Sequence, residues 1–317
     1  MIGNSIWFDL AKYLPYWDEV IPVDFKKFKT ISYYRWKLLR KIRCIGAEIA
    51  MQPTFSREFY HGDSLVRASG ASKKVSSTGD LSNLNRFKKF ISDHWYTELI
   101  FASKENLTEL ERNAEFFSRV SRKNYSSSYP KLTVKESWCS NEFNKSPFYI
   151  LGPGASTILK EWPLANFANL AEKIYLHTGW NGLICGTTKE HFLGEQIINQ
   201  CNVPLINLAG KTKLSELSGL LSQSQLTITN DTGTAHISSA IGTSTICILG
   251  GGHFGRFMPY PDIIGTTNCL EAVFEKMPCY NCNWECIYEI KTGDPAPCIS
   301  SISVDAVWKK VIPKLNG

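Results

Sequence analysis

Residues 226–236, Leu-Thr-Ile-Thr-Asn-Asp-Thr-Gly-Thr-Ala-His, pass from an apolar run to a helix start within a few positions. The run Leu226 to Thr229 is rich in β-branched side chains and predicts a buried strand. Asp231 to Gly233 predicts the turn, and Thr234 suits the N-cap of a short helix that continues to Ile241. The stretch is therefore predicted to be one strand–loop–helix unit, the building block of a sheet with parallel strands.

The same alternation extends from this unit in both directions. Short apolar runs predict strands, and the segments between them carry apolar residues at helical spacing. The predicted strands are Phe148–Leu151, Gly182–Gly186, Pro204–Leu208, Leu226–Thr229 and Ser244–Leu249. This part of the chain is therefore predicted to be an α/β, doubly wound, Rossmann-like domain.

The first part of the chain shows the pattern less clearly. Glu19–Val23 and Ala47–Met51 predict strands, with a basic helical stretch between them. Gly70–Asn85 is rich in Ser, Gly, Lys and Asn and predicts a loop, and the serines of Ser121–Ser128 predict a linker. We therefore expect two domains, residues 1–128 and residues 129–317.

Composition narrows the class of protein. The 317 residues are 43% hydrophobic and 20% charged, which is ordinary for a globular protein, and no apolar run approaches the length of a membrane span. The N-terminus lacks the basic start and apolar run of a secretion signal, so a cytoplasmic location is expected. In that compartment the ten cysteines are expected to be reduced thiols or metal ligands.

The net charge of +6 is unevenly distributed. Between Asp24 and Arg43 aromatic residues alternate with eight basic ones: Lys26, Lys27, Lys29, Arg35, Lys37, Arg40, Lys41 and Arg43. This pattern predicts either a solvated amphipathic helix or a surface that contacts anionic lipid headgroups or a phosphorylated acceptor. No nucleic-acid-binding motif accompanies the charge, so nucleic acid is not an expected partner.

Two loops have the composition of a phosphate site at strand ends. Gly152–Ser156 offers small residues and free backbone amides, and Lys160 follows as a cation. In Asp231–His236, Gly233 would let a diphosphate approach the start of the next helix. Asp231 would repel phosphate and is better suited to a sugar hydroxyl or to loop amides. His236 is predicted to be either a structural residue or a ligand contact.

Taken together these segments resemble glycosyltransferase family 9, the bacterial heptosyltransferases. The resemblance is carried by Asp231-Thr232-Gly233-Thr234-Ala235-His236, by Lys160-Glu161-Trp162-Pro163 and by Leu208 to Leu217. It implies a GT-B fold of two Rossmann-like domains facing a cleft, and inverting transfer of heptose from ADP-heptose to a lipopolysaccharide core acceptor. A family member that glycosylates a protein or another glycan, a catalytically silent nucleotide-sugar-binding protein and an interaction module without a donor site are the alternatives.

The resemblance also implies roles for individual residues. Lys160 would neutralise the departing diphosphate, Asp231 would hold heptose hydroxyls, and His236 would lie beside the diphosphate, with no metal required for transfer. The implied donor-binding residues are Gly154, Ser156, Lys160, Thr187, Thr188, Lys211, Thr212, Asp231, Thr232, Gly233, Thr234 and His236.

The chain departs from the family pattern at its start. Family members begin with a strand and a glycine loop that carries an Asp as general base, and this chain is predicted to lack that first βα unit. The catalytic base is therefore unassigned, with Asp9 as a candidate and Glu48 and Asp63 as alternatives.

A cysteine-rich segment lies near the C-terminus. Cys279, Cys282 and Cys286, with Cys298 beyond them, include one pair at CxxC spacing. Four thiols would suit a structural zinc or iron ion, and some protein-modifying relatives in the family bind iron. The alternative is a set of reduced thiols in a surface loop.

Overall fold

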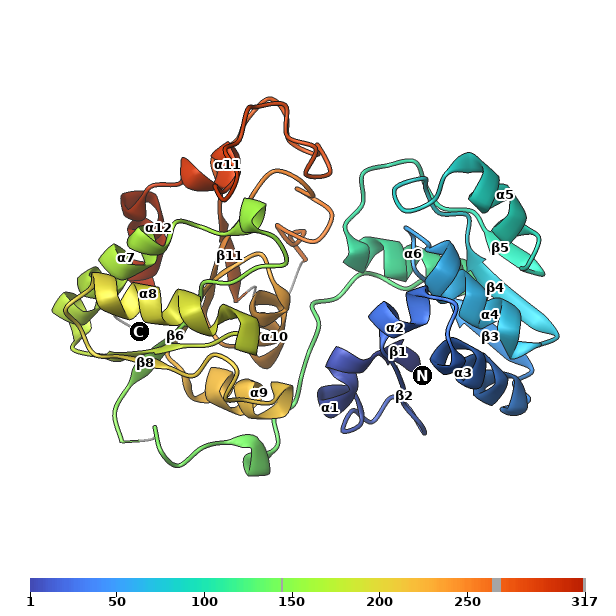
Figure 1. Cartoon of the computed structure of the whole chain (residues 1–317), viewed down its shortest axis with the longest axis horizontal. Coiled ribbons are helices and arrows are strands. Elements are labelled where there is room, and N and C mark those ends of the chain that lie inside the picture. The colour runs from blue at the N-terminus through green and yellow to red at the C-terminus, as the bar shows by residue number, and fades with distance from the viewer. Residues whose placement is uncertain (144, 264–268, 316–317) are drawn as a thin grey trace. The chain divides into compact units, whose positions relative to one another are not determined.

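The computed structural model describes residues 1–143, 145–263 and 269–315. The chain divides into two compact units, Met1–Ser128 and Tyr129–Gly317 (Figure 1). No helix in these ranges is long and apolar enough to cross a membrane.

The second unit is built on a six-stranded parallel sheet with the strand order β11-β10-β9-β6-β7-β8. The strands are β6 (Phe148–Gly152), β7 (Asn181–Ile184), β8 (Leu205–Asn207), β9 (Leu226–Asn230), β10 (Thr245–Ile248) and β11 (Leu270–Val273). From β6 the chain adds β7 and β8 on one side, then returns to add β9, β10 and β11 on the other. The predicted doubly wound sheet is confirmed, and its strand order reverses between β6 and β9.

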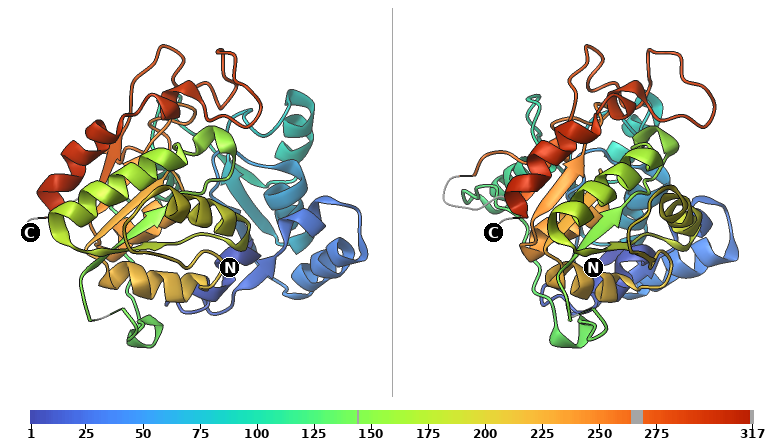
Figure 2. Two further views of the ribbon diagram at one scale, coloured as in Figure 1. Left: turned by 60° about the vertical axis from the view of Figure 1, so that its left-hand side comes forward. Right: turned by 90° about the vertical axis from the view of Figure 1, so that its left-hand side faces the viewer.

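Helices pack on this sheet in two groups, and the strands lie between them (Figure 2). Right-handed crossovers place α7 and α8 on one face and α9 and α10 on the other. α12 packs on α7, and α9 packs on α10. The helices are α7 (Leu164–Thr178), α8 (His191–Gln200), α9 (Leu214–Gln223), α10 (Gly233–Ile241), α11 (Pro297–Ser300) and α12 (Val304–Val311).

The strands of this unit could be predicted from the sequence because they lie in its core. Every residue of β6, β9 and β10 is buried, because both faces of the sheet are covered. Trp162, at the entrance to α7, is fully buried and donates its indole N–H to Ile302 O at 2.8 Å.

The first unit contains two small parallel sheets, β1-β2 and β3-β4-β5. The strands are β1 (Ile2–Asn4), β2 (Ile21–Val23), β3 (Ile49–Gln52), β4 (Lys73–Ser77) and β5 (Glu98–Ile100). The α-helices are α1 (Phe8–Ala11), α2 (Phe25–Lys29), α3 (Tyr33–Cys44), α4 (Ser64–Ser69), α5 (Arg86–Asp93) and α6 (Glu109–Ser121). Parallel strands that alternate with helices make this unit Rossmann-like as well.

One expectation for this unit needs correction. β4 runs through the segment that was predicted to be a loop, because Ser76 and Ser77 are buried in the sheet and Ser76 Oγ donates to Gln52 O at 2.9 Å. A short strand, β1, and the helix α1 come before Ile21–Val23, and β1 pairs in parallel with β2. That the chain lacks the first βα unit of the family stays a prediction.

Candidate functional site

The reversal of strand order brings together the loops that follow β6 and β9. In a doubly wound sheet this point, at the carboxyl ends of the strands, is where ligands bind. The side chain of Asn230 ties the two loops to each other: its amide donates to Pro153 O at 2.6 Å, and its oxygen accepts from the Trp162 amide at 3.1 Å. Because Asn230 is fully buried, the loop containing Lys160 is fixed relative to the end of β9.

Two glycines allow this close approach. A Cβ on Gly152 would lie 2.4 Å from Thr229 Oγ1, and a Cβ on Gly154 would lie 2.2 Å from Glu190 Cδ. Close packing at these two positions therefore explains why both residues are glycine. Contact of Gly154 with a ligand remains a prediction, whereas Ser156, two residues further on, is exposed at the same edge.

The start of α10 has the features of an anion site. The helix begins at Gly233 with Thr232 as its N-cap, so the prediction of Thr234 as the cap is wrong by two residues. Thr232 makes no side-chain cap bond; its hydroxyl lies 3.3 Å from that of Thr229. The first amides of α10 therefore lack a side-chain cap, Gly233 is exposed beside them, and the helix dipole favours negative charge here.

Lys160 and Asp231 form an ion pair in front of this helix. Lys160 Nζ lies 3.6 Å from Asp231 Oδ2, and the two side chains are 13% and 9% exposed. The carboxylate is thus already paired with a cation, so it would not present an unpaired negative charge to a phosphate. The pair offers a cation to a diphosphate and an acceptor to a sugar hydroxyl.

His236 lies one turn into α10 and is held by Tyr260. Its Nδ1 is 2.7 Å from Tyr260 Oη, and the two rings are stacked. Burial lowers the pKa of His236, although Asp231 opposes the change, and burial raises the pKa of Tyr260 to about 12. The phenol therefore keeps its proton and can donate it to Nδ1 of a neutral ring, which leaves the ring proton on Nε2 as a donor.

The remaining predicted donor residues lie on the neighbouring loops after β7 and β8. Thr187 and Thr188 are exposed, and a Cβ on Gly210 would lie 2.6 Å from Thr188 Cα, so these two loops are in contact. Lys211 is exposed and Thr212 partly exposed on the second loop. The predicted residues therefore form two groups at one edge of the sheet.

Two carboxylates outside the predicted set of residues lie at the same edge of the sheet. Glu190 Oε2 accepts from the Thr187 amide at 2.6 Å while the rest of its carboxyl group packs against Gly154. Burial raises the pKa of Glu161; the Ala155 amide opposes the rise and Glu190 adds to it. The only sequence signal for Glu190 is its place in the capping box that begins at Thr187.

The three candidate bases lie in different environments. Asp9 is in α1, shortly after β1, where it pairs with Lys12 at 3.1 Å. A role for Asp9 as the base stays a prediction. Glu48 precedes β3, at the amino end of the strand, which is the wrong edge for a ligand site in this fold.

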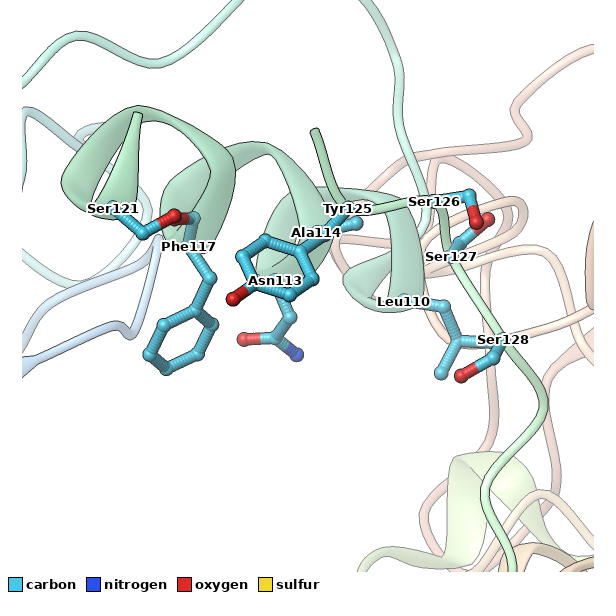
Figure 3. A pocket seen from close by; sticks show the side chains of 9 residues that line it. All are labelled: Leu110, Asn113, Ala114, Phe117, Ser121, Tyr125, Ser126, Ser127 and Ser128. Atoms are coloured by element: carbon cyan, nitrogen blue, oxygen red, sulfur yellow. The ribbon is translucent and has the colours of Figure 1, made fainter. Parts of the chain in front are cut away.

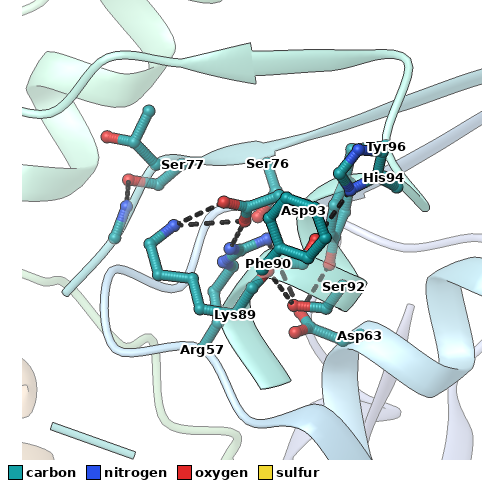
Figure 4. Close-up of polar contacts among 12 residues, drawn as sticks. Arg57, Asp63, Ser76, Ser77, Lys89, Phe90, Ser92, Asp93, His94 and Tyr96 are labelled. Atoms are coloured by element: carbon teal, nitrogen blue, oxygen red, sulfur yellow. Dashed lines mark hydrogen bonds and ion pairs between the residues drawn. The ribbon is translucent and has the colours of Figure 1, made fainter. Parts of the chain in front are cut away.

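Asp63 belongs to a buried polar network (Figure 4). Its carboxylate accepts from Tyr96 Oη at 2.6 Å and lies 3.9 Å from Arg57 Nη1, and it is fully buried. Arg57 also pairs with Asp93. A carboxylate enclosed in this way cannot reach an acceptor hydroxyl, so the alternative assignment of Asp63 as base is wrong.

The cysteines of the C-terminal segment are near one another but do not form a ready metal site. None of the ten cysteines is in a disulfide. Burial raises the pKa of Cys298, and the thiols of Cys279, Cys282 and Cys286 add to the rise. Among the described residues, no group of three or more potential ligands is arranged to hold a metal ion.

A groove of about 430 Å³ lies in the first unit, along α6 and the serine-rich segment after it (Figure 3). It is lined by Leu110, Asn113, Ala114, Phe117, Ser121, Tyr125 and Ser126–Ser128. These residues include none of the predicted donor-binding set and no carboxylate, imidazole or amine, so the groove offers no acid–base chemistry.

Comparison with known proteins identifies the family of the chain. A model of "Glycosyltransferase family 9 (heptosyltransferase)" matches residues 96–285. Lipopolysaccharide heptosyltransferase 2 of Escherichia coli is 25% identical over 200 residues, which are 60% of this chain and 53% of that protein. Lipopolysaccharide core heptosyltransferase OpsX of Haemophilus influenzae is 28% identical over 40% of this chain and 37% of its own length. The matches thus span about half the length of these curated relatives or less.

Solved structures show the same fold. The structure of E. coli ADP-heptose lipopolysaccharide heptosyltransferase II covers 99% of this chain and 88% of its own, with a TM-score of 0.71 and 18% identity. A family 9 glycosyltransferase from Veillonella parvula covers 99% and 87%, with a TM-score of 0.74 and 18% identity. These are GT-B proteins, so the predicted fold class is confirmed. Because the family model matches well over half of the chain and this fold accompanies it, the protein belongs to glycosyltransferase family 9, the heptosyltransferases.

Proposed function

We propose that the protein is an inverting glycosyltransferase that transfers heptose from ADP-heptose to a lipopolysaccharide core acceptor. The observation that carries the proposal is the Lys160–Asp231 pair in front of α10, at the reversal point of the sheet. Relatives named as lipopolysaccharide heptosyltransferases support the choice of sugar and acceptor.

The site suits the departure of a diphosphate without a metal. The ammonium of Lys160 and the first amides of α10 would stabilise the charge that develops on the leaving ADP. Asp231 would accept hydrogen bonds from the sugar, and Nε2–H of His236 would donate to a sugar or phosphate oxygen. Inversion requires that the acceptor hydroxyl attack from the face opposite the departing ADP and lose its proton to a base. We retain Asp9 as the candidate base.

Transfer is tested by incubating the full chain with ADP-heptose and a heptose-free core acceptor and measuring ADP release and product mass. Lys160→Gln should lower the rate by about 100-fold or more, the scale for loss of one preorganised donor to developing charge. Release of ADP with a protein or another glycan, but not with the core, would favour that acceptor class. Donor binding without turnover would support the silent-protein alternative. Absence of any binding of ADP-heptose would refute the proposal, and the alternative of an interaction module without a donor site would remain.

We further propose peripheral contact with the inner face of the cytoplasmic membrane through α3 and the turn before it. Ile31, Tyr33 and Trp36 are 103%, 72% and 56% exposed. The rings of Tyr33 and Trp36 stack, and Arg40 lies over Trp36. Exposed aromatic rings among cations suit an anionic lipid interface, where each Lys or Arg contributes about 1 kcal/mol.

Sedimentation with vesicles tests this surface. Lys37→Gln/Lys41→Gln should weaken binding to phosphatidylglycerol vesicles roughly 30-fold, which corresponds to about 2 kcal/mol. Leu176→Ser, at an 84% exposed apolar position in α7, is the matched control and should have no effect. Equal binding to neutral and anionic vesicles, or an unchanged double variant, would refute the contact.

For the cysteines we propose a structural zinc or iron ion held by Cys279, Cys282, Cys286 and Cys298. Gly251 supports it, because its amide donates to Cys298 Sγ at 3.4 Å and its carbonyl accepts from the Asn281 amide at 2.7 Å, within the segment of the other three cysteines. The thiols would have to turn toward one another to share an ion. Metal analysis of the purified chain should find about one ion per chain and much less in Cys298→Ser, with Cys44→Ser as the exposed-thiol control. A metal-free chain of unchanged stability would refute the site.

A further inference from the structure

The segment Cys279–Cys286, here the cysteine loop, packs on the turn Gly250–Gly252 that follows β10. The amides of Asn281 and Asn283 donate to Gly251 O and Gly252 O at 2.7 and 2.9 Å. The side chain of Asn283 also bonds His253 Nε2 at 2.7 Å. The loop is therefore fixed to the carboxyl edge of the same sheet that carries the candidate donor site.

Two glycines of this turn leave room for the indole of Trp284, because they carry no Cβ atom. A Cβ on Gly250 would lie 2.6 Å from Trp284 Cη2, and a Cβ on Gly252 would lie 2.4 Å from its Cε2. Any larger residue at either position would displace the ring. The indole therefore lies directly against the backbone of this turn, and the His253 ring meets it edge-on.

The backbone of Trp284 is itself in an unfavourable conformation. Its φ is +65°, in the left-handed region that bulky residues rarely adopt, and Asn281 and Asn283 are also at positive φ. The indole Nε1 is buried without a hydrogen-bond partner in the described structure. Such a combination persists only where surrounding contacts enforce it, and it is commonest at functional sites.

The indole meets the ammonium group of Lys160, which lies 4.9 Å from the ring centroid. The same ammonium is 3.6 Å from Asp231 Oδ2. Lys160 is thus in contact with both an aromatic ring and a carboxylate, and each of them attracts the cation. A flexible four-carbon side chain is restricted to one position before any ligand arrives.

We propose that Trp284 is a positioning residue that holds the Lys160 ammonium beside Asp231, ready to meet the diphosphate of a bound nucleoside diphosphate. The inference rests on the proposed donor function of this site. Restricting Lys160 in advance lowers the entropy that binding must otherwise remove. The cysteine loop thereby contributes to donor affinity without touching the donor.

The test is calorimetric titration of ADP into the full chain and its variants. Trp284→Leu should weaken ADP binding by about three- to tenfold, the range of a partly desolvated cation–π contact, while Trp284→Phe should stay near the wild type because it keeps an aromatic face. In a Lys160→Gln background, Trp284→Leu should change the affinity by less than about twofold, since the partner is gone.

Trp308→Leu is the matched control. It removes another Trp–Lys contact, with Lys173 at 6.0 Å from the ring, beside His177 at the far end of α7. It should leave ADP affinity unchanged. If Trp284→Leu does not fold, Gly252→Ala displaces the same indole and should weaken binding in the Lys160 background only.

The outcomes separate the two proposals. A wild-type chain that does not bind ADP would remove the proposed function and this inference with it. A wild type that binds ADP while Trp284→Leu binds equally well, or loses the same factor with and without Lys160, would overturn the positioning role and leave the donor function intact.

Discussion

Replacing Asn230 by Ala should destabilise the second unit strongly and weaken ADP binding at the same time. The fully buried amide makes two bonds between loops, to the Trp162 amide at 3.1 Å and to Pro153 O at 2.6 Å. The substitution leaves one buried donor and one buried acceptor unpaired, and each costs about 1–3 kcal/mol. We expect a loss of about 3 kcal/mol in the free energy of unfolding.

For a unit of this size, 1 kcal/mol shifts the melting temperature by about 2–4 °C, so the variant should melt roughly 6–12 °C lower. Thermal unfolding followed by fluorescence measures this shift, and titration of ADP at a temperature where the variant is folded measures the site. Asn202→Ala removes an exposed amide from the same unit and serves as the control. A shift of Asn230→Ala no larger than that of the control would refute the assigned role of the two bonds.

Three further variants test other parts of the structure. Gly152→Ala should lower the free energy of unfolding by about 1–3 kcal/mol, because its Cβ would lie 2.4 Å from Thr229 Oγ1 in a full core; urea denaturation measures this, and a neutral result would contradict the packing. Because burial lowers the pKa of His236, the unfolded state binds a proton more readily than the folded state. The stability contributed by the neutral ring is complete above the ordinary pKa of about 6.5 and is lost as pH falls below that value and through the lower pKa of the folded state. The melting temperature of the wild type should therefore fall more steeply between pH 7 and pH 5 than that of His236→Gln. Equal slopes of melting temperature against pH for the two proteins would contradict this role of His236. Asp63→Ala should cost about 3–5 kcal/mol by leaving the buried Arg57 with less counter-charge; a free energy of unfolding equal to that of the wild type in urea denaturation would refute this structural role.

The second unit was largely predictable because its strands are buried on both faces. Runs such as Phe148–Leu151 are apolar at every position, and the loops between them carry glycine. The loops of the candidate site were predictable from their small residues at strand ends, since ligands bind at the carboxyl ends of the strands in such sheets. The start of α10 was misplaced because two threonines flank Gly233 and local preference does not distinguish them.

The first unit was less predictable because contacts distant in sequence determine it. β4 has only one apolar residue, Val75, and its serines become strand residues by bonding to β3 and packing in the sheet. Likewise, nothing local marks Glu190 as a neighbour of Gly154 or Trp284 as a neighbour of Lys160. Such pairs are created by the topology, so periodicity and motif spacing cannot reveal them.

The bond between Asn230 and Pro153 also bears on how the protein is made. It spans 77 residues of chain, because the strands that flank the reversal point are neighbours in the sheet but not in sequence. During translation, β6, β7 and β8 leave the ribosome well before β9, so the earlier strands exist for a time without the partner that completes the donor edge. Strand pairs that are distant in sequence form slowly, and the apolar edges of the earlier strands stay exposed until the partner strand pairs with them. Under the proposed donor function, ADP would stabilise only the finished sheet, and a nascent chain that stops before β9 would gain no stability from the nucleotide.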